Sequence, residues 1–135
     1  MNQQTVGHHH VVSRVAVIIL AVVMIIFGVY HFMQPQNLLV YVPSFMPGGK
    51  VWVYLVGLAF ILAAIAFITH RMAKLAGYLL AALLFIFVLA VHLPNYLNAG
   101  DTDLRQMAFV SILKDTALAA FALYIASNAK NLDKD

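Results

Sequence analysis

Charged residues occur in small groups along the chain, and long apolar stretches separate these groups. No charged residue lies between Arg14 and Lys50, or between Lys74 and Asp101. A helix needs about 20 mostly apolar residues to cross a bilayer. Four stretches meet this length, at 14–33, 51–69, 73–93 and 107–127. The pattern therefore predicts an all-α fold, an integral membrane four-helix transmembrane bundle with up-down topology, in which residues 1–135 form a single membrane domain.

The connection between the first two stretches is rich in proline. Pro35, Pro43 and Pro47 precede Gly48, and prolines at this density stop a regular helix. The segment Asn37–Val42 within it is apolar and uncharged. Non-helical backbone at membrane depth survives only where protein or water surrounds it. We therefore expect this segment to lie in the membrane interface or to fold back against the bundle.

The third and fourth stretches carry small residues at helical spacing. Ala73, Gly77 and Ala81 recur every fourth residue of the third stretch. Stripes of this kind let membrane helices approach closely. They predict tight packing of these helices and also permit a homodimer. Pro94 is predicted to end the third helix, since the proline ring disrupts a helix interior.

Basic residues are more frequent at one end of the predicted helices than at the other. Lys50 and Arg105 lie on one side, and five basic residues lie on the other: Arg14, Arg71, Lys74, Lys130 and Lys134. The positive-inside rule then predicts that both termini are cytoplasmic. The basic residues form no patch, so nucleic acid is not an expected partner. The absence of cysteine excludes thiol chemistry within the chain.

Lys114 and Asp115 are adjacent inside the fourth stretch. A charged side chain in a bilayer costs about 2.5–3.5 kcal/mol on insertion scales, so such residues usually serve a purpose. Residues four, seven and eleven positions after Asp115 share its helix face, and they are Ala119, Ala122 and Ala126. We therefore expect Asp115 to face the bundle. Lys114 lies about 100° away on a bulkier face and can extend outward along its own stem.

Two histidines come to a similar level on other helices. His31 lies near the outer end of the first stretch, and His92 lies near the outer end of the third. The polar residues therefore gather in the outer third of the bundle, which favours an outward-facing site over a channel. We predict a ligand-binding site made of His31, His92, Lys114 and Asp115, without a metal. The partner of Asp115 is left open between Lys114, Arg105 and a histidine.

The chain resembles the DoxX family of small four-helix bacterial membrane proteins, in particular its DoxX-like branch, from Gly28 to Ala126. The motifs that carry the resemblance are Gly28-Val-Tyr-His31-Phe32 with Pro35, Val42-Pro43, Met46-Pro47, Gly57, Arg71 to Lys74 with Ala76-Gly77, His92-x-Pro94-Asn95, and Phe109-x-x-Ile-Leu-Lys114-Asp115. One position departs from the family. Members often carry a glutamate shortly after the glycine of the second helix, where this chain has Phe60.

The resemblance implies a multi-pass protein of the bacterial inner membrane. It also implies an accessory subunit of a membrane redox assembly, without catalytic activity of its own, whose partners are the lipid bilayer and a redox protein. The ligand would be a quinone or a small anion. Two alternatives remain open, a small-solute or proton permease and a structural assembly protein.

Overall fold

The computed structural model describes residues 3–39, 42 and 44–129, and every regular element in these ranges is helical. The elements are α1 (Gln3–Met33), α2 (Pro35–Leu38), α3 (Lys50–Thr69), α4 (Ala73–Phe87), the π turn η2 (Val88–His92), α5 (Leu93–Leu97) and α6 (Thr102–Ser127). In the described part of the chain, four helical segments are long and apolar enough to cross a membrane: Val11–Met33, Lys50–Thr69, Ala73–Leu97 and Thr102–Ser127. The predicted all-α class is confirmed, and so is the presence of four helices long and apolar enough to span a membrane.

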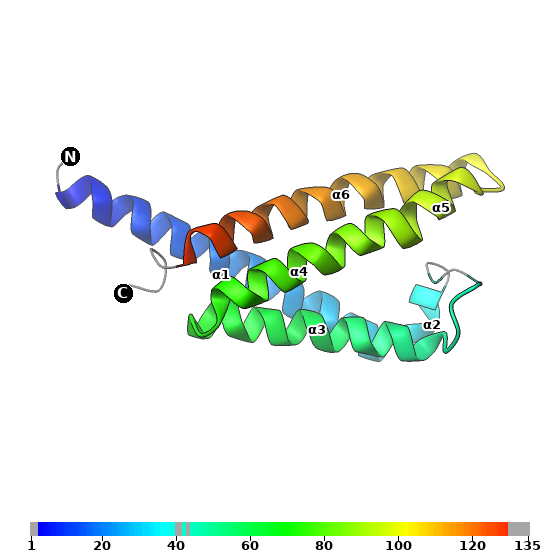
Figure 1. Cartoon of the computed structure of the whole chain (residues 1–135), viewed down its shortest axis with the longest axis horizontal. Helices are drawn as coiled ribbons and strands as arrows, with labels where there is room; N and C mark the ends of the chain where they lie inside the picture. The colour runs from blue at the N-terminus through cyan, green and yellow to red at the C-terminus, as the bar shows by residue number, and fades with distance from the viewer. Residues whose placement is uncertain (1–2, 40–41, 43, 130–135) are drawn as a thin grey trace.

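The long helices pack as two pairs, α1 along α3 and α4 along α6, with a smaller contact between α3 and α4. Figure 1 shows the turn between α3 and α4 at the same end as the start of α1 and the end of α6. The α2 segment and the α5–α6 connection lie at the opposite end, where the two pairs are further apart. This arrangement leaves room between the pairs at that end. Lys130 and Lys134, which contributed to the charge argument, lie outside the described residues.

The end where the pairs meet is held by the turn between α3 and α4. His70 and Met72 both take left-handed backbone conformations, with φ of 57° and 58°, and so reverse the chain within a few residues. The Arg14 guanidinium of α1 donates a hydrogen bond to Nε2 of His70 at 2.6 Å. This contact ties α1 to the turn that joins the two pairs.

The small-residue stripes of α4 and α6 face each other. A Cβ atom added to Gly77 would lie 2.8 Å from the carbonyl oxygen of Ala122 and 2.8 Å from Cβ of Ala126. Ala73 and Ala81 are also buried. The predicted close packing is therefore present within one chain. Since the two stripes cover each other, a homodimer would need another surface, and it stays a prediction.

A second close crossing joins α1 to α3. A Cβ atom on Gly57 would lie 2.7 Å from Cβ of His31 and 3.0 Å from the carbonyl oxygen of Gly28. A Cβ atom on Gly28 would lie 2.8 Å from the carbonyl oxygen of Gly57. The two glycines therefore set the distance between these helices and place the backbone of α1 directly against α3 beside His31.

The prediction that Pro94 ends the third helix is wrong. The helix continues through the π turn into α5, where the N–H of Leu93 donates to the carbonyl of Val88. Pro94 then follows the π turn directly, as one of the first residues of α5. The wider π turn thus lets the chain pass the proline without breaking the helix, and the helical segment reaches Leu97.

Asp101 caps α6. Its carboxylate accepts a hydrogen bond from the N–H of Leu104 at 2.7 Å, and its own backbone is extended. Replacing Asp101 with alanine is expected to lower the free energy of unfolding by about 1 kcal/mol, as other N-cap replacements do. The measurement is denaturant unfolding in mixed micelles. Asp101→Asn retains an accepting oxygen and is expected to stay within a few tenths of the wild-type value; an equal loss in both variants would contradict the capping role.

Candidate functional site: a cavity between the two helix pairs

A cavity of about 380 Å³ lies between the two helix pairs. Its walls are mostly apolar and come from α1, α3, α4, η2 and α6, with α2 and the following loop at its edge. The larger apolar side chains in the walls are Met24, Phe27, Val53, Phe60, Leu80, Leu84, Phe87 and Leu118. Pockets of about 300–1,000 Å³ with apolar walls and a few polar groups are typical of small-molecule sites.

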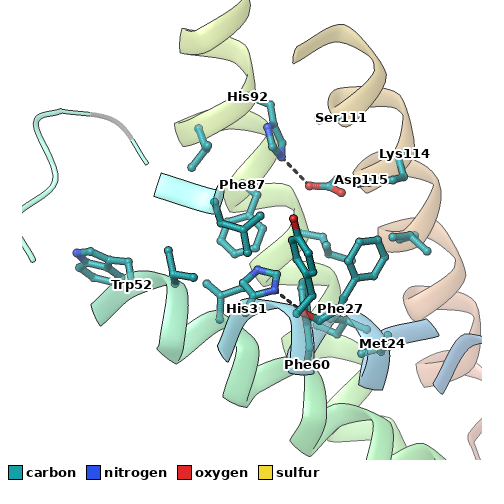
Figure 2. Close-up of a pocket in the computed structure, with 18 of the residues that line it drawn as sticks. Met24, Phe27, His31, Trp52, Phe60, Phe87, His92, Ser111, Lys114 and Asp115 are labelled. Carbon is teal, nitrogen blue, oxygen red and sulfur yellow. Dashed lines mark hydrogen bonds and ion pairs between the residues drawn. The ribbon is translucent and has the colours of Figure 1, made fainter. Parts of the chain in front are cut away.

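All four predicted site residues line this one cavity. They come from three different helical segments, since His31 belongs to α1, His92 to η2, and Lys114 and Asp115 to α6. Figure 2 shows His92 and Asp115 pointing toward one another, with His31 on the facing wall. The structure therefore brings the four together, and ligand binding by them stays a prediction.

Asp115 pairs with His92. Nε2 of His92 lies 2.8 Å from Oδ2 of Asp115, and both residues are buried, with 9% and 6% of their surface exposed. A buried carboxylate needs such a partner because water cannot solvate it. Of the three candidate partners of Asp115 named from the sequence, the structure shows a histidine. Arg105 lies instead over the ring of Tyr96, 5.9 Å from its centroid.

The π turn gives His92 its direction. In a regular α-helix, eight residues advance about 80° beyond two full turns, so His92 would point away from the face of Leu84. A π turn uses one more residue for its hydrogen bond than an α turn, and this extra residue restores nearly the same direction. Leu84 is buried in the core of the bundle, and His92 therefore also reaches the buried face, where it meets Asp115.

Asp115 faces the bundle as predicted, because Ala119, Ala122 and Ala126 on its helix face are all buried. Ile125 lies eleven positions after Lys114, on the same helix face as Lys114, and is buried as well. The buried part of α6 is therefore wider than the alanine stripe.

Lys114 points away from Asp115 and toward α1. Its ammonium lies over the ring of Phe27, 5.1 Å from the centroid. Lys114 is exposed, as is Tyr30 of α1, and both line the cavity. The edge of the cavity formed by Lys114 and Tyr30 is therefore exposed. Lys114 and Asp115 are neighbours in the chain but act on different parts of the site.

His31 is held by its own helix. Its Nδ1 donates to the carbonyl oxygen of Phe27 at 2.6 Å, because a carbonyl can only accept. In the neutral ring, Nε2 is then an acceptor. The ring stands edge-on to Phe60, with centroids 5.5 Å apart at 90°. Phe60 occupies the region where the resemblance would place a glutamate, so this chain has an aromatic wall there.

Several cavity residues were not singled out from the sequence. Asn37, Val42 and Met46 come from α2 and the loop after it, which confirms that part of the segment Asn37–Val42 folds back against the bundle; residues 40 and 41 lie outside the described ranges. Trp52 lines the cavity as well and donates through Nε1 to the carbonyl of Pro47. The contact of Phe27 with the cavity was not predicted, because the sequence of an apolar helix does not show which of its aromatic residues lines a cavity.

The arrangement combines three chemical properties. The apolar walls accept hydrocarbon or a ring, the His92–Asp115 pair can hold or release one proton between Nε2 and Oδ2, and Lys114 supplies a positive charge. In the described ranges, no group of three or more histidine, cysteine or acidic residues could hold a metal ion. The site therefore suits an organic molecule with an apolar body and a polar end.

The fold and the cavity define a small helical protein with four membrane-spanning candidates and an amphipathic cavity between two helix pairs. A family model described as "Domain of unknown function (DUF8561)" matches residues 20–126, and the chain belongs to this family. The matched range includes all four predicted site residues. Neither the curated proteins nor the solved structures contain a match.

Proposed function

We propose that the protein is a DoxX-like accessory subunit of a redox assembly in the bacterial inner membrane, and that its cavity binds a quinone-like molecule. In this proposal the helices cross the membrane in up-down order, both termini are cytoplasmic, and the cavity opens toward the outer side. A redox partner protein supplies the catalytic activity. The observation that supports the proposal most is the meeting of His31, His92, Lys114 and Asp115, from three helical segments, in one mostly apolar cavity.

The residues fit a quinone-like ring. Phe27, Phe60 and Phe87 supply aromatic walls, and the ammonium of Lys114 can donate to a ring oxygen at the cavity edge. A bound quinone would supply the transfer of electrons together with protons. The His92–Asp115 pair is the group beside the cavity that can take up or release such a proton.

A permease receives less support from the structure. The buried cluster that extends from the cavity toward the α3–α4 turn consists, among the described residues, of apolar side chains such as Leu20, Ala64, Phe67 and Ile125. A proton or ion path needs relay groups through this region.

A purely structural role for the His92–Asp115 pair predicts that no small molecule accompanies the purified protein, and this distinguishes it from the proposal.

The test is extraction of the protein in native lipid particles without detergent, followed by mass spectrometry of the bound lipids and quinones. Wild-type protein is expected to retain a quinone, and Asp115→Asn is expected to lose it while staying folded. Asp103→Asn is the matched control, because it removes the same charge from an exposed position of α6 outside the cavity. Equal quinone content in wild type and Asp115→Asn would contradict the proposal.

A further inference from the structure

The charge of Lys114 is compensated less completely than that of Asp115. Asp115 accepts from His92, whereas Lys114 forms no ion pair with a carboxylate in the part of the chain that the structure describes. Its ammonium has the ring of Phe27 as its contact, 5.1 Å from the centroid. A cation–π contact with one ring compensates an ammonium less fully than an ion pair with a carboxylate does. An anion beside Lys114 would supply the missing compensation.

The position of Lys114 also limits the shape of such an anion. The ammonium lies at an exposed edge of the cavity, over Phe27 of α1, and the apolar walls of the cavity include Met24, Leu84 and Leu118. A molecule that reaches Lys114 with its charged end therefore has its apolar part against these walls. A small hydrophilic anion would leave the walls without contact and would have no reason to prefer this site to water.

The carboxylate of Asp115 does not oppose this arrangement. It lies about 100° around the helix from Lys114 and is already held by the His92 imidazole at 2.8 Å. The two groups thus divide the cavity into a cationic edge and a hydrogen-bonded, buried pair.

We propose that Lys114 is the specificity-determining residue of the cavity and that it selects amphiphiles with a single anionic oxygen. This inference rests on the proposed function, because it concerns the same cavity, and it adds the chemical class of the ligand. Two kinds of amphiphile carry such an anionic oxygen. One is a long-chain fatty acid, through its carboxylate, and the other is an alkylated hydroxyquinone, through its ionised ring hydroxyl. In both cases the oxygen lies on the ammonium and the hydrocarbon lies against the apolar walls.

The experiment measures binding to the full chain in nanodiscs of zwitterionic phospholipid, with two pairs of probes. One pair is palmitate and hexadecanol, and the other is an alkylated hydroxynaphthoquinone and the same quinone without the hydroxyl group. For wild-type protein, the anionic member of at least one pair is expected to bind about tenfold more tightly than its neutral partner. Lys114→Met, which keeps the apolar stem, is expected to reduce this preference to nearly one, and Lys114→Arg is expected to keep most of it.

Lys74→Met is the matched control, because Lys74 is exposed on α4 outside the cavity, and it is expected to bind as wild type does. The same preference for anionic probes in Lys114→Met and wild type, or no preference in wild type, would overturn the inference.

The two proposals fail in different ways. Tight binding of the quinone without a hydroxyl group, unchanged in Lys114→Met, would overturn the inference and leave the proposed function in place. Binding of palmitate that depends on Lys114, with no binding of either quinone, would support the inference and contradict the quinone-like ligand of the proposed function.

Discussion

Replacing Asp115 with alanine is expected to lower the free energy of unfolding by about 3 kcal/mol. Removing the partner of a buried polar group costs about 1–3 kcal/mol. Removing one member of a buried ion pair costs about 3–5 kcal/mol, so a value near 3 kcal/mol is common to both cases. The variant would leave the His92 imidazole buried opposite a gap where the carboxylate now lies at 2.8 Å. The measurement is reversible unfolding in mixed micelles, followed by circular dichroism.

A double-mutant cycle of His92→Leu and Asp115→Leu tests whether the two residues act as a pair. The double variant is expected to be more stable than the sum of the single losses predicts, because neither group then remains alone in an apolar interior. Hydrogen bonds between membrane helices contribute about 0.6 kcal/mol on average and at most about 1.7 kcal/mol. A coupling energy well above that range would indicate a charged pair, and one within it a neutral hydrogen bond.

Asp103→Ala is the control for the loss of a carboxylate from α6. Asp103 is exposed in the first turn of the helix, so only its interaction with the helix dipole is lost, worth less than about 1 kcal/mol. A stability of Asp115→Ala equal to that of Asp103→Ala, or strictly additive losses in the cycle, would contradict the structural role given to the pair.

Replacing Gly57 with alanine is expected both to destabilise the protein and to disturb the cavity. The added Cβ atom would lie 2.7 Å from Cβ of His31 and 3.0 Å from the carbonyl of Gly28, so α1 must move away from α3. Overpacking of this kind costs about 1–3 kcal/mol. Because His31 lines the cavity wall, the shift is also expected to weaken ligand binding severalfold. Unfolding in micelles and binding of the retained ligand measure the two effects.

Gly77→Ala is the matched variant. Its Cβ atom would meet the α6 backbone at 2.8 Å, a comparable clash, but at a crossing that does not line the cavity. It is expected to lose similar stability and to keep ligand binding. Gly100→Ala, where nothing lies within 4 Å, is expected to change neither. Equal loss of binding in Gly57→Ala and Gly77→Ala would show that the cavity responds to general destabilisation and not to the position of His31.

The resemblance to DoxX-like proteins and the membership in a family of unknown function concern nearly the same part of the chain, Gly28 to Ala126 and residues 20–126. Nothing in the family membership assigns a ligand. The cavity therefore provides the most direct route to a function, since it can be probed without knowledge of a partner. Its two polar parts, the His92–Asp115 pair and Lys114, are separately testable.

Much of the architecture was predictable from the sequence because it depends on local properties. Four apolar stretches of sufficient length require helices in a bilayer, where each backbone group must find its hydrogen bond within the segment. The face of Asp115 was also predictable, because helical spacing alone places it with Ala119 and Ala122. The same spacing correctly separated Asp115 from Lys114.

Other features depend on contacts between distant segments and were decided only by the tertiary structure. The pairing of Asp115 with His92 and not with Arg105 depends on how α4 and α6 meet, and on a π turn that rotates His92 by one residue. No residue in Val88–His92 predicts a π turn, and Pro94 by itself predicted that the third helix ends there. The contact of Lys114 with Phe27 and the cavity itself likewise arise because α1 packs on α3, α6 packs on α4, and the two pairs separate at one end. The sequence determined which polar residues enter the apolar helices, and the packing of those helices determined which of them meet.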